Sequence, residues 1–314
     1  MTSTTMTSMR DGGTLVHAAL LYRSPEHLRV TLEEFVRDAG SAGEPCLIAM
    51  PGAHLEELAS ALDAAGDVHV QDMTECGRNP ARLIPMLVDW LDDQRGPARV
   101  VSESLWPGRS YAEAAECLRH EALLNVALAQ RDVSVLCPYD AEHLDDELLA
   151  GAALTHPHLI DEVGPRPSMS YGDPVEVARG DGWPQAEPAS PVSELMFDGD
   201  LRRLRHELAA DPLLADLDPT RRADLVFAVN EAASNAVRHG EGLARARVWR
   251  VDDGVVGEIS TPTAIEDPLA GLRTPAPDDP GGRGLWLINQ LCDLVEVRSG
   301  EMGASVRMHI GLPE

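Results

Sequence analysis

Short apolar runs alternate with segments of helical periodicity between Leu15 and about Leu159, and this alternation constrains the fold more than any other feature of the chain. Strands that are separated by helices pair in parallel, because each crossover returns the chain to the same end of the sheet. The pattern therefore predicts a mainly parallel α/β domain over residues 14–163. The strands are expected at 16–22, 45–50, 68–70, 98–101 and 133–137, and the helices at 25–36, 55–65, 80–94, 111–129 and 145–153.

The composition changes on both sides of this domain. Residues 1–13 are polar and are expected to form a disordered tail. Residues 164–192 contain six prolines and several glycines, which predicts an interdomain linker with little regular structure.

A second domain is predicted over residues 193–314, because the pattern changes there to helices segregated from hairpins. Asp218 is suited to cap one of the helices. The sheet is expected to be largely antiparallel, in an α/β sandwich. The expected helices are 200–210, 219–238 and 284–292, and the expected hairpins pair 244–251 with 255–260 and 293–298 with 304–310.

Composition excludes several classes of function. The 314 residues include no lysine, which excludes a P-loop lysine, a Schiff-base lysine and a lysine general base. A net charge of −26 argues against a nucleic-acid partner. Five cysteines without a C-x-x-C pair fit a reduced compartment. The polar N-terminus and the lack of a run of roughly 20 apolar residues predict a cytoplasmic protein that does not enter a membrane.

The clearest chemical pattern lies in the second domain. Glu231 and Asn235 are four residues apart on the helix expected at 219–238, so they share a face. An amide oxygen can bind a hard cation and a carboxylate can accept a proton from a hydroxyl. Gly282 and Gly284 stand at the start of the next helix, where backbone N–H groups can approach phosphates. This combination suits a magnesium nucleotide.

With Asp267-Pro268 and Leu291-Cys292-Asp293, these runs resemble the GHKL (Bergerat-fold) ATPases, and more narrowly the anti-sigma-factor serine kinases, over about residues 193–314. The resemblance implies that Glu231 activates an acceptor serine and that Asn235 binds Mg²⁺. It also implies that residues 268–281 form a lid over ATP. The phosphate contacts would come from Gly282 and Gly284, with Arg283 and Leu285 as further nucleotide-binding candidates, although Arg283 could equally cap the local structure.

One motif departs from that family. Its members carry Asp-x-Gly after the second strand of this region, where the Asp reads the adenine amino group, but this chain has Thr261-Pro262-Thr263. A threonine hydroxyl accepts a hydrogen bond without the added strength of a charge. The sequence therefore predicts weakened or absent ATP binding and leaves serine kinase activity open.

The first domain resembles the MEDS sensory domain, a RecA-like α/β module, over about residues 14–160. The resemblance is carried by His17, Tyr22, Asn79-Pro80, Arg82, Glu103, Trp106, Arg109, residues 121–125, Cys137-Pro138-Tyr139-Asp140 and Thr155-His156-Pro157. It implies a small organic ligand, and the ligand-contacting candidates are His17, Glu103, Glu121 and Cys137.

Simpler roles remain open for these four candidates. Glu103 and Glu121 could pair with Arg109 and Arg119 respectively, and His17 and Cys137 could pack inside the strands on which they fall. Metal coordination would need several ligands to converge, which the sequence alone does not show.

Taken together, the resemblances imply a cytoplasmic anti-sigma factor that a ligand-sensing domain controls. Its partners would be a sigma factor, an anti-anti-sigma (STAS-domain) protein that it phosphorylates with Mg-ATP, and a second copy of itself. Two alternatives stay open: a GHKL pseudokinase that acts only by binding, and a signalling histidine kinase.

Overall fold

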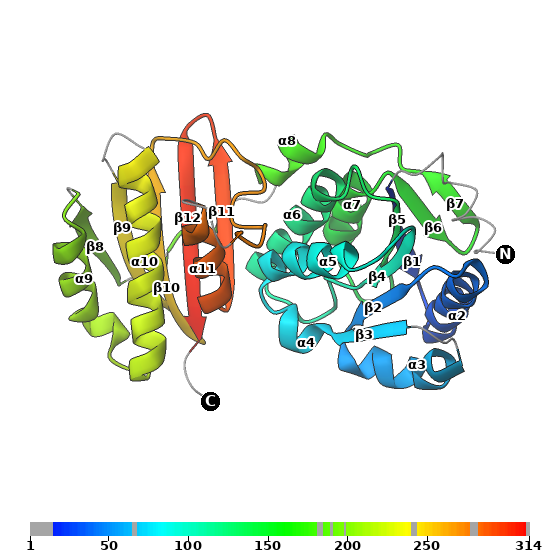
Figure 1. Cartoon of the computed structure of the whole chain (residues 1–314). Coiled ribbons are helices and arrows are strands. Elements are labelled where there is room, and N and C mark those ends of the chain that lie inside the picture. The colour runs from blue at the N-terminus through cyan, green and yellow to red at the C-terminus, as the bar shows by residue number, and fades with distance from the viewer. Residues whose placement is uncertain are drawn as a thin grey trace. The chain divides into compact units, whose positions relative to one another are not determined.

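The computed structural model divides the chain into two compact units, Met1–Ala178 and Arg179–Glu314, each with its own sheet (Figure 1). The predicted tail at 1–13 lies outside the described part of the chain. The described residues are 15–64, 68–180, 185–188, 191–197, 199–239, 244–276 and 282–311.

The sheet of the first unit has the strand order β3-β2-β4-β5-β1-β6-β7, in which all pairs are parallel except β6 with β7. This confirms the predicted mainly parallel α/β fold. The strands are β1 (Val16–Tyr22), β2 (Cys46–Met50), β3 (Val68–Asp72), β4 (Ala98–Ser102), β5 (Val133–Asp140), β6 (His158–Asp161) and β7 (Gly164–Pro167). The helices are α2 (Pro25–Ala42), α3 (Gly52–Ala64), α4 (Met73–Cys76), η1 (Pro80–Arg82), α5 (Leu83–Asp92), α6 (Tyr111–Ala127), α7 (Asp146–Thr155) and α8 (Pro174–Ala178).

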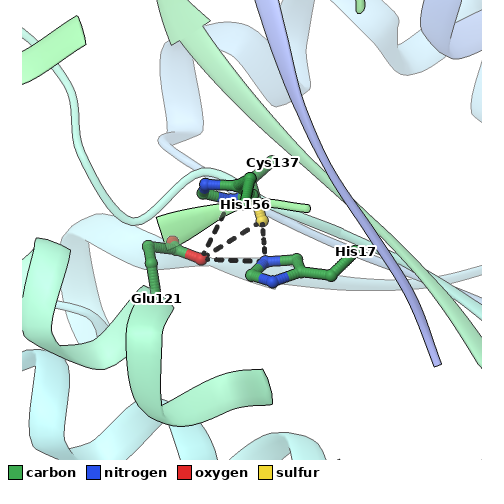
Figure 2. Close-up of side chains that lie close together, drawn as sticks. All are labelled: His17, Glu121, Cys137 and His156. Atoms are coloured by element: carbon green, nitrogen blue, oxygen red, sulfur yellow. Dashed lines mark hydrogen bonds and ion pairs between the residues drawn. The ribbon is translucent and has the colours of Figure 1, made fainter. Parts of the chain in front are cut away.

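Helices cover both faces of this sheet. Side chains alternate along a strand, so Ala18 and Leu20 of β1 point to the face that packs on Leu32 and Phe35 of α2. His17 points to the opposite face, where α6 lies (Figure 2). Cys137 shares the face of His17, because the register pairs it with Ala19, two residues further along β1. The α6 face of the sheet therefore carries polar side chains at its centre.

The segment predicted as a linker has more structure than expected. Strand β7 pairs with β6, and the carbonyl of Ala178 at the end of helix α8 accepts a hydrogen bond from Nε of Arg119 at 3.1 Å. Residues 164–178 thus belong to the first unit, and the expectation of little regular structure is wrong for β7 and α8. The many prolines did not prevent a strand because β7 is an edge strand.

The sheet of the second unit is antiparallel, with the strand order β11-β12-β10-β9-β8. Figure 1 shows α10 and α11 lying along one face of it. This is the predicted α/β sandwich, with β8 as an edge strand that the sequence pattern did not predict. The strands are β8 (Val192–Phe197), β9 (Ala244–Val251), β10 (Gly254–Thr261), β11 (Leu294–Gly300) and β12 (Gly303–Gly311). The helices are α9 (Leu201–Ala209), η2 (Pro212–Leu214), α10 (Pro219–His239) and α11 (Arg283–Leu291).

Helix α10 is fixed at its start and along its length. Asp218 accepts hydrogen bonds from the backbone N–H groups of Thr220 (2.9 Å) and Arg221, which confirms the predicted cap. Arg221 also donates to the carbonyl of Leu291 and pairs with Asp293, so α10 is tied to the end of α11. These contacts hold α10 and α11 in a fixed relation.

The sheet face opposite to α10 and α11 carries a row of alternating charges. The register aligns one residue from each strand, in the order Glu194, Arg247, Glu258, Arg307 and Glu296. Glu258 accepts from the Nε atoms of both arginines, at 2.8 Å from Arg247 and 2.7 Å from Arg307. Burial raises the pKa of Glu258, but these two arginines outweigh it and hold that pKa below its usual value.

Across the described ranges, every helix is too short or too polar to cross a membrane.

Candidate functional site

Asn235 lies on α10 with its side chain against the start of α11. A Cβ atom built on Gly284 would be 2.8 Å from Nδ2 and 3.2 Å from Oδ1 of Asn235. Any other residue at 284 would push the Asn235 amide out of this position, so glycine lets the backbone of α11 approach the amide as it stands. The structure brings together two of the residues that the sequence predicted for one site.

Glu231 stands one turn before Asn235 on α10, and both side chains are half-buried. Its Oε1 accepts a hydrogen bond from Asn230 at 3.3 Å, and Arg205 of α9 donates to the Asn230 amide oxygen at 2.8 Å. These two residues orient one carboxylate oxygen of Glu231. We did not predict Arg205 or Asn230 from the sequence, although Asn230 precedes Glu231 directly.

Helix α11 starts at a glycine-rich turn. Gly282 has φ +80°, a conformation that disfavours other residues, and it has no side chain to cap the first N–H groups of the helix. Leu285 follows inside the first turn and packs against the hydrophobic core. Arg283 donates to the carbonyl of Ala276 at 3.1 Å, so it contacts the segment before α11.

The segment predicted as an ATP lid is anchored near its beginning. Asn289 of α11 donates to the carbonyl of Gly271 at 3.0 Å, and Leu269 and Leu272 are buried. A Cβ on Gly271, which has φ +77°, would lie 2.6 Å from Cβ of Leu285. Residues 277–281, the remaining part of the predicted lid, lie outside the described residues.

Thr261 is the last residue of strand β10, Thr263 follows the strand, and a hydrogen bond joins the two. The backbone N–H of Thr263 donates to Oγ1 of Thr261 at 3.3 Å. The hydroxyl that stands where the family has its adenine-reading Asp therefore already accepts a local hydrogen bond. Their predicted nucleotide-contacting role stays a prediction.

In the first unit, three of the four predicted ligand-contacting residues converge. His17 of β1, Glu121 of α6 and Cys137 of β5 come together with His156, which follows α7 directly, and Figure 2 shows the four side chains pointing toward one another. Each is at most 1% exposed. We call these four residues the buried cluster.

The contacts inside the buried cluster centre on one oxygen, Oε2 of Glu121. It lies 3.2 Å from Nε2 of His17, 3.4 Å from Sγ of Cys137 and 3.5 Å from Nε2 of His156. Burial, followed by the charge of Glu121, raises the pKa of the Cys137 thiol well above its usual value. Burial, with His17 beside it, lowers the pKa of His156.

His156 is the member that we did not assign a role from the sequence. It falls within the Thr155-His156-Pro157 run, but its convergence with residues from three other elements depends on the tertiary fold. The expected pairing of Glu121 with Arg119 is wrong, because Arg119 pairs with Glu116 and with the carbonyl of Ala178.

Glu103 lies in a different environment, after the end of β4. It is fully buried, and it accepts from Nδ1 of His54 at 2.7 Å rather than from Arg109. Burial raises the pKa of Glu103 although the hydrogen bond from His54 opposes this, and that hydrogen bond raises the pKa of His54. Burial, then the charge of Glu103, raises the pKa of Tyr22 at the end of β1. Carboxyl ends of parallel strands are the usual place for a ligand in such folds.

Comparison with known protein families gives two matches. Residues 16–157 match the family described as MEDS: MEthanogen/methylotroph, DcmR Sensory domain. Residues 198–310 match the family described as Histidine kinase-like ATPase domain. No curated protein matches the chain.

Proposed function

We propose that this chain, which consists of a MEDS sensory domain followed by a histidine kinase-like ATPase domain, is a cytoplasmic anti-sigma factor that binds Mg-ATP and phosphorylates a protein partner. The pairing of a sensory domain with such an ATPase domain is that of a signalling regulator. The sigma factor, the anti-anti-sigma partner and the kinase reaction are the finer parts of the proposal.

One observation carries the nucleotide part of this proposal: the Asn235 amide lies against Gly284, at the start of α11. An amide oxygen is a ligand suited to Mg²⁺, and the first N–H groups of a helix attract phosphate oxygens. A magnesium ion on Asn235 would therefore meet a triphosphate whose oxygens accept from the backbone around Gly282 and Gly284.

Glu231 suits the role of general base. Asn230 holds one of its oxygens, and the second can accept the proton of a partner's serine hydroxyl. The serine oxygen would then bond to the γ-phosphorus of ATP as the bond to the β-γ bridging oxygen breaks, giving phosphoserine and ADP. The magnesium ion would offset the charge on the leaving diphosphate.

The regulatory output would depend on which partner protein the ATPase domain binds. The ATPase domain would hold a sigma factor away from RNA polymerase, and an unphosphorylated STAS-domain protein would compete for the same surface. Phosphorylation would release the competitor. A small organic ligand in the MEDS domain can shift this balance only if it binds two conformations of the chain unequally.

A second candidate is a binding module without kinase activity. It is favoured by Thr261, whose hydroxyl stands in place of the family's Asp and already accepts from the backbone of Thr263. Such a module would hold the same partners, and its choice between them would not depend on ATP.

Radiolabel transfer separates the candidates. The chain and a co-purified partner are incubated with γ-labelled ATP and Mg²⁺, using the wild type, Glu231→Gln, and Glu301→Gln as the matched control, because Glu301 is an exposed acid in the β11-β12 turn. The kinase proposal expects label on a partner serine, at least tenfold less with Glu231→Gln and unchanged with Glu301→Gln. A stable complex without label would exclude the kinase and support the binding module. Acid-labile label on the chain itself would indicate a histidine kinase instead.

A further inference from the structure

We propose that the buried cluster binds one divalent transition-metal ion of the zinc class, with His17, Glu121, Cys137 and His156 as its four ligands. This site lies in the first unit and is independent of the proposed kinase reaction.

The spacing of the ligand atoms fits a tetrahedral ion. Bonds of about 2.0–2.3 Å to nitrogen, oxygen and sulfur at tetrahedral angles place neighbouring ligand atoms about 3.3–3.6 Å apart. The separations from Oε2 of Glu121 to Nε2 of His17, Sγ of Cys137 and Nε2 of His156 are 3.2, 3.4 and 3.5 Å. Sγ of Cys137 is also 3.4 Å from Nε2 of His17. All four atoms lie within 4.8 Å of one another, so small side-chain shifts would complete the coordination.

The outer hydrogen bonds of His17 fix which ring nitrogen faces the cluster. Asn125 uses its Nδ2 to donate to backbone carbonyls, including that of Thr155 at 2.8 Å, so its Oδ1 is an acceptor. Nδ1 of His17 lies 3.0 Å from that oxygen and must therefore carry the proton. Nε2 of His17 then presents a lone pair to the cluster.

His156 is fixed in the same way. Its Nδ1 lies 2.9 Å from the backbone carbonyl of Ala152, which can only accept, so this nitrogen is the donor. Within the described residues, Nε2 of His156 has no hydrogen-bond partner although it is buried and faces Glu121. Metal-bound histidines commonly donate their other ring N–H to a backbone carbonyl or a carboxylate, which sets the tautomer.

The cluster is consequently short of protons. Two imidazole lone pairs and a thiol surround Oε2 of Glu121. Of these three neutral groups, only the thiol has a proton that it can donate to this oxygen. Glu121 uses its other oxygen to accept from Ser104, so that oxygen is already occupied. Electron pairs that face one another without solvent are unfavourable unless a cation lies between them. A divalent ion, with loss of the thiol proton, satisfies all four atoms at once.

The donor set indicates the class of ion. Two imidazoles and a thiolate favour borderline or soft transition metals over Mg²⁺ and Ca²⁺, which prefer oxygen. Four protein ligands and full burial are typical of structural sites, in which no position is left for a substrate. The ion would join β1, β5, α6 and the residue after α7, and would leave the His54–Glu103 pair as a separate place for an organic ligand.

Cobalt titration tests the proposal on the full chain. The chain is stripped with a chelator and titrated with Co²⁺, which reports tetrahedral geometry through visible d–d bands and thiolate through a near-ultraviolet charge-transfer band. We expect one equivalent to bind and one equivalent of Zn²⁺ to displace it. In Cys137→Ser we expect the charge-transfer band to be lost and Co²⁺ affinity to fall at least tenfold.

Cys46→Ser is the matched control, because Cys46 is equally buried in the same sheet but lies on β2, outside the cluster. It should bind Co²⁺ as the wild type does. X-ray absorption of the zinc-loaded wild type does not depend on whether a variant folds. It should show one sulfur about 2.3 Å from the zinc, with nitrogen and oxygen ligands at about 2.0–2.1 Å. Binding of less than one equivalent, an unchanged charge-transfer band in Cys137→Ser, or a zinc shell without sulfur would each overturn the proposal.

Discussion

The candidate sites of the two units hold their polar groups in opposite ways. The buried cluster is closed on every side, and Asn125, Ala152 and Ser104 fix the orientation of its members. Glu231 and Asn235, which we call the α10 pair, are half-buried, and among the described residues the outer hydrogen bonds reach Glu231 alone, through Asn230 and Arg205. A closed and fully oriented set suits a ligand that stays bound, whereas a half-exposed pair beside a helix start suits one that exchanges.

The largest difference is expected when the central acid of each set is neutralised. In the zinc-loaded chain, Glu121→Gln should lower the free energy of unfolding by about 3–5 kcal/mol, because it removes the carboxylate from a buried site that also holds a metal cation and a thiolate. Glu231→Gln should change it by less than about 0.5 kcal/mol, as is usual for half-exposed positions. Denaturant unfolding of both variants measures this contrast. Equal losses of unfolding free energy in the two variants would contradict the contrast between a closed buried cluster and a half-exposed α10 pair.

A methyl group at Gly284 should disturb only the α10 pair. Gly284→Ala places Cβ 2.8 Å from Nδ2 of Asn235, so the amide must move. We expect affinity for Mg-ATP to fall about tenfold, which corresponds to about 1.4 kcal/mol. Gly300→Ala is the control, since its Cβ would meet no atom within 4 Å. Calorimetry of both variants measures the effect, and equal affinities would remove Gly284 from the nucleotide site.

Affinity for ATP should increase when the aspartate that the family carries is restored at position 261. Thr261→Asp adds a carboxylate where the adenine amino group would lie, and a charged acceptor exceeds a neutral one by about 1 kcal/mol. Affinity for ATP should therefore rise about fivefold. The control is GTP, which has no amino group at that ring position and should gain nothing. No gain for ATP would favour the binding module.

Sequence reasoning reached the α10 pair but only part of the buried cluster, and the reason is physical. The α10 pair is local, because Glu231 and Asn235 are one helical turn apart and the glycine run marks the next helix start. The buried cluster draws on four separate elements, and its acid lies on a helix in which residues 114–124 are all buried. A helix buried on all sides has no polar face, so its periodicity does not show where Glu121 points.

The fold was predicted best where strands are short, apolar and central. Strand β1 was placed at its observed bounds, whereas the four-residue strand β6 and the edge strands β7 and β8 were not predicted. Edge strands tolerate proline and polar residues, so they lack the apolar pattern on which the prediction depends.

The smallest effect is expected in the pH dependence of the second unit. The pKa of Glu258 is lower in the folded chain than in the unfolded chain, because Arg307 and Arg247 outweigh its burial. Its contribution to stability is therefore full above the unfolded pKa and is lost as the pH falls through the folded pKa. The unfolding free energies of the wild type and Glu258→Gln should differ at neutral pH and converge in acid. A difference that stays constant with pH would contradict this role of the two arginines.

Calorimetric titration of the full chain with ATP measures whether the α10 pair holds an exchangeable magnesium nucleotide. We expect saturable heat for one site per chain, loss of that heat when Mg²⁺ is omitted, and affinity at least tenfold weaker in Asn235→Ala. The absence of heat in the wild type, or an identical isotherm for Asn235→Ala, would contradict this expectation.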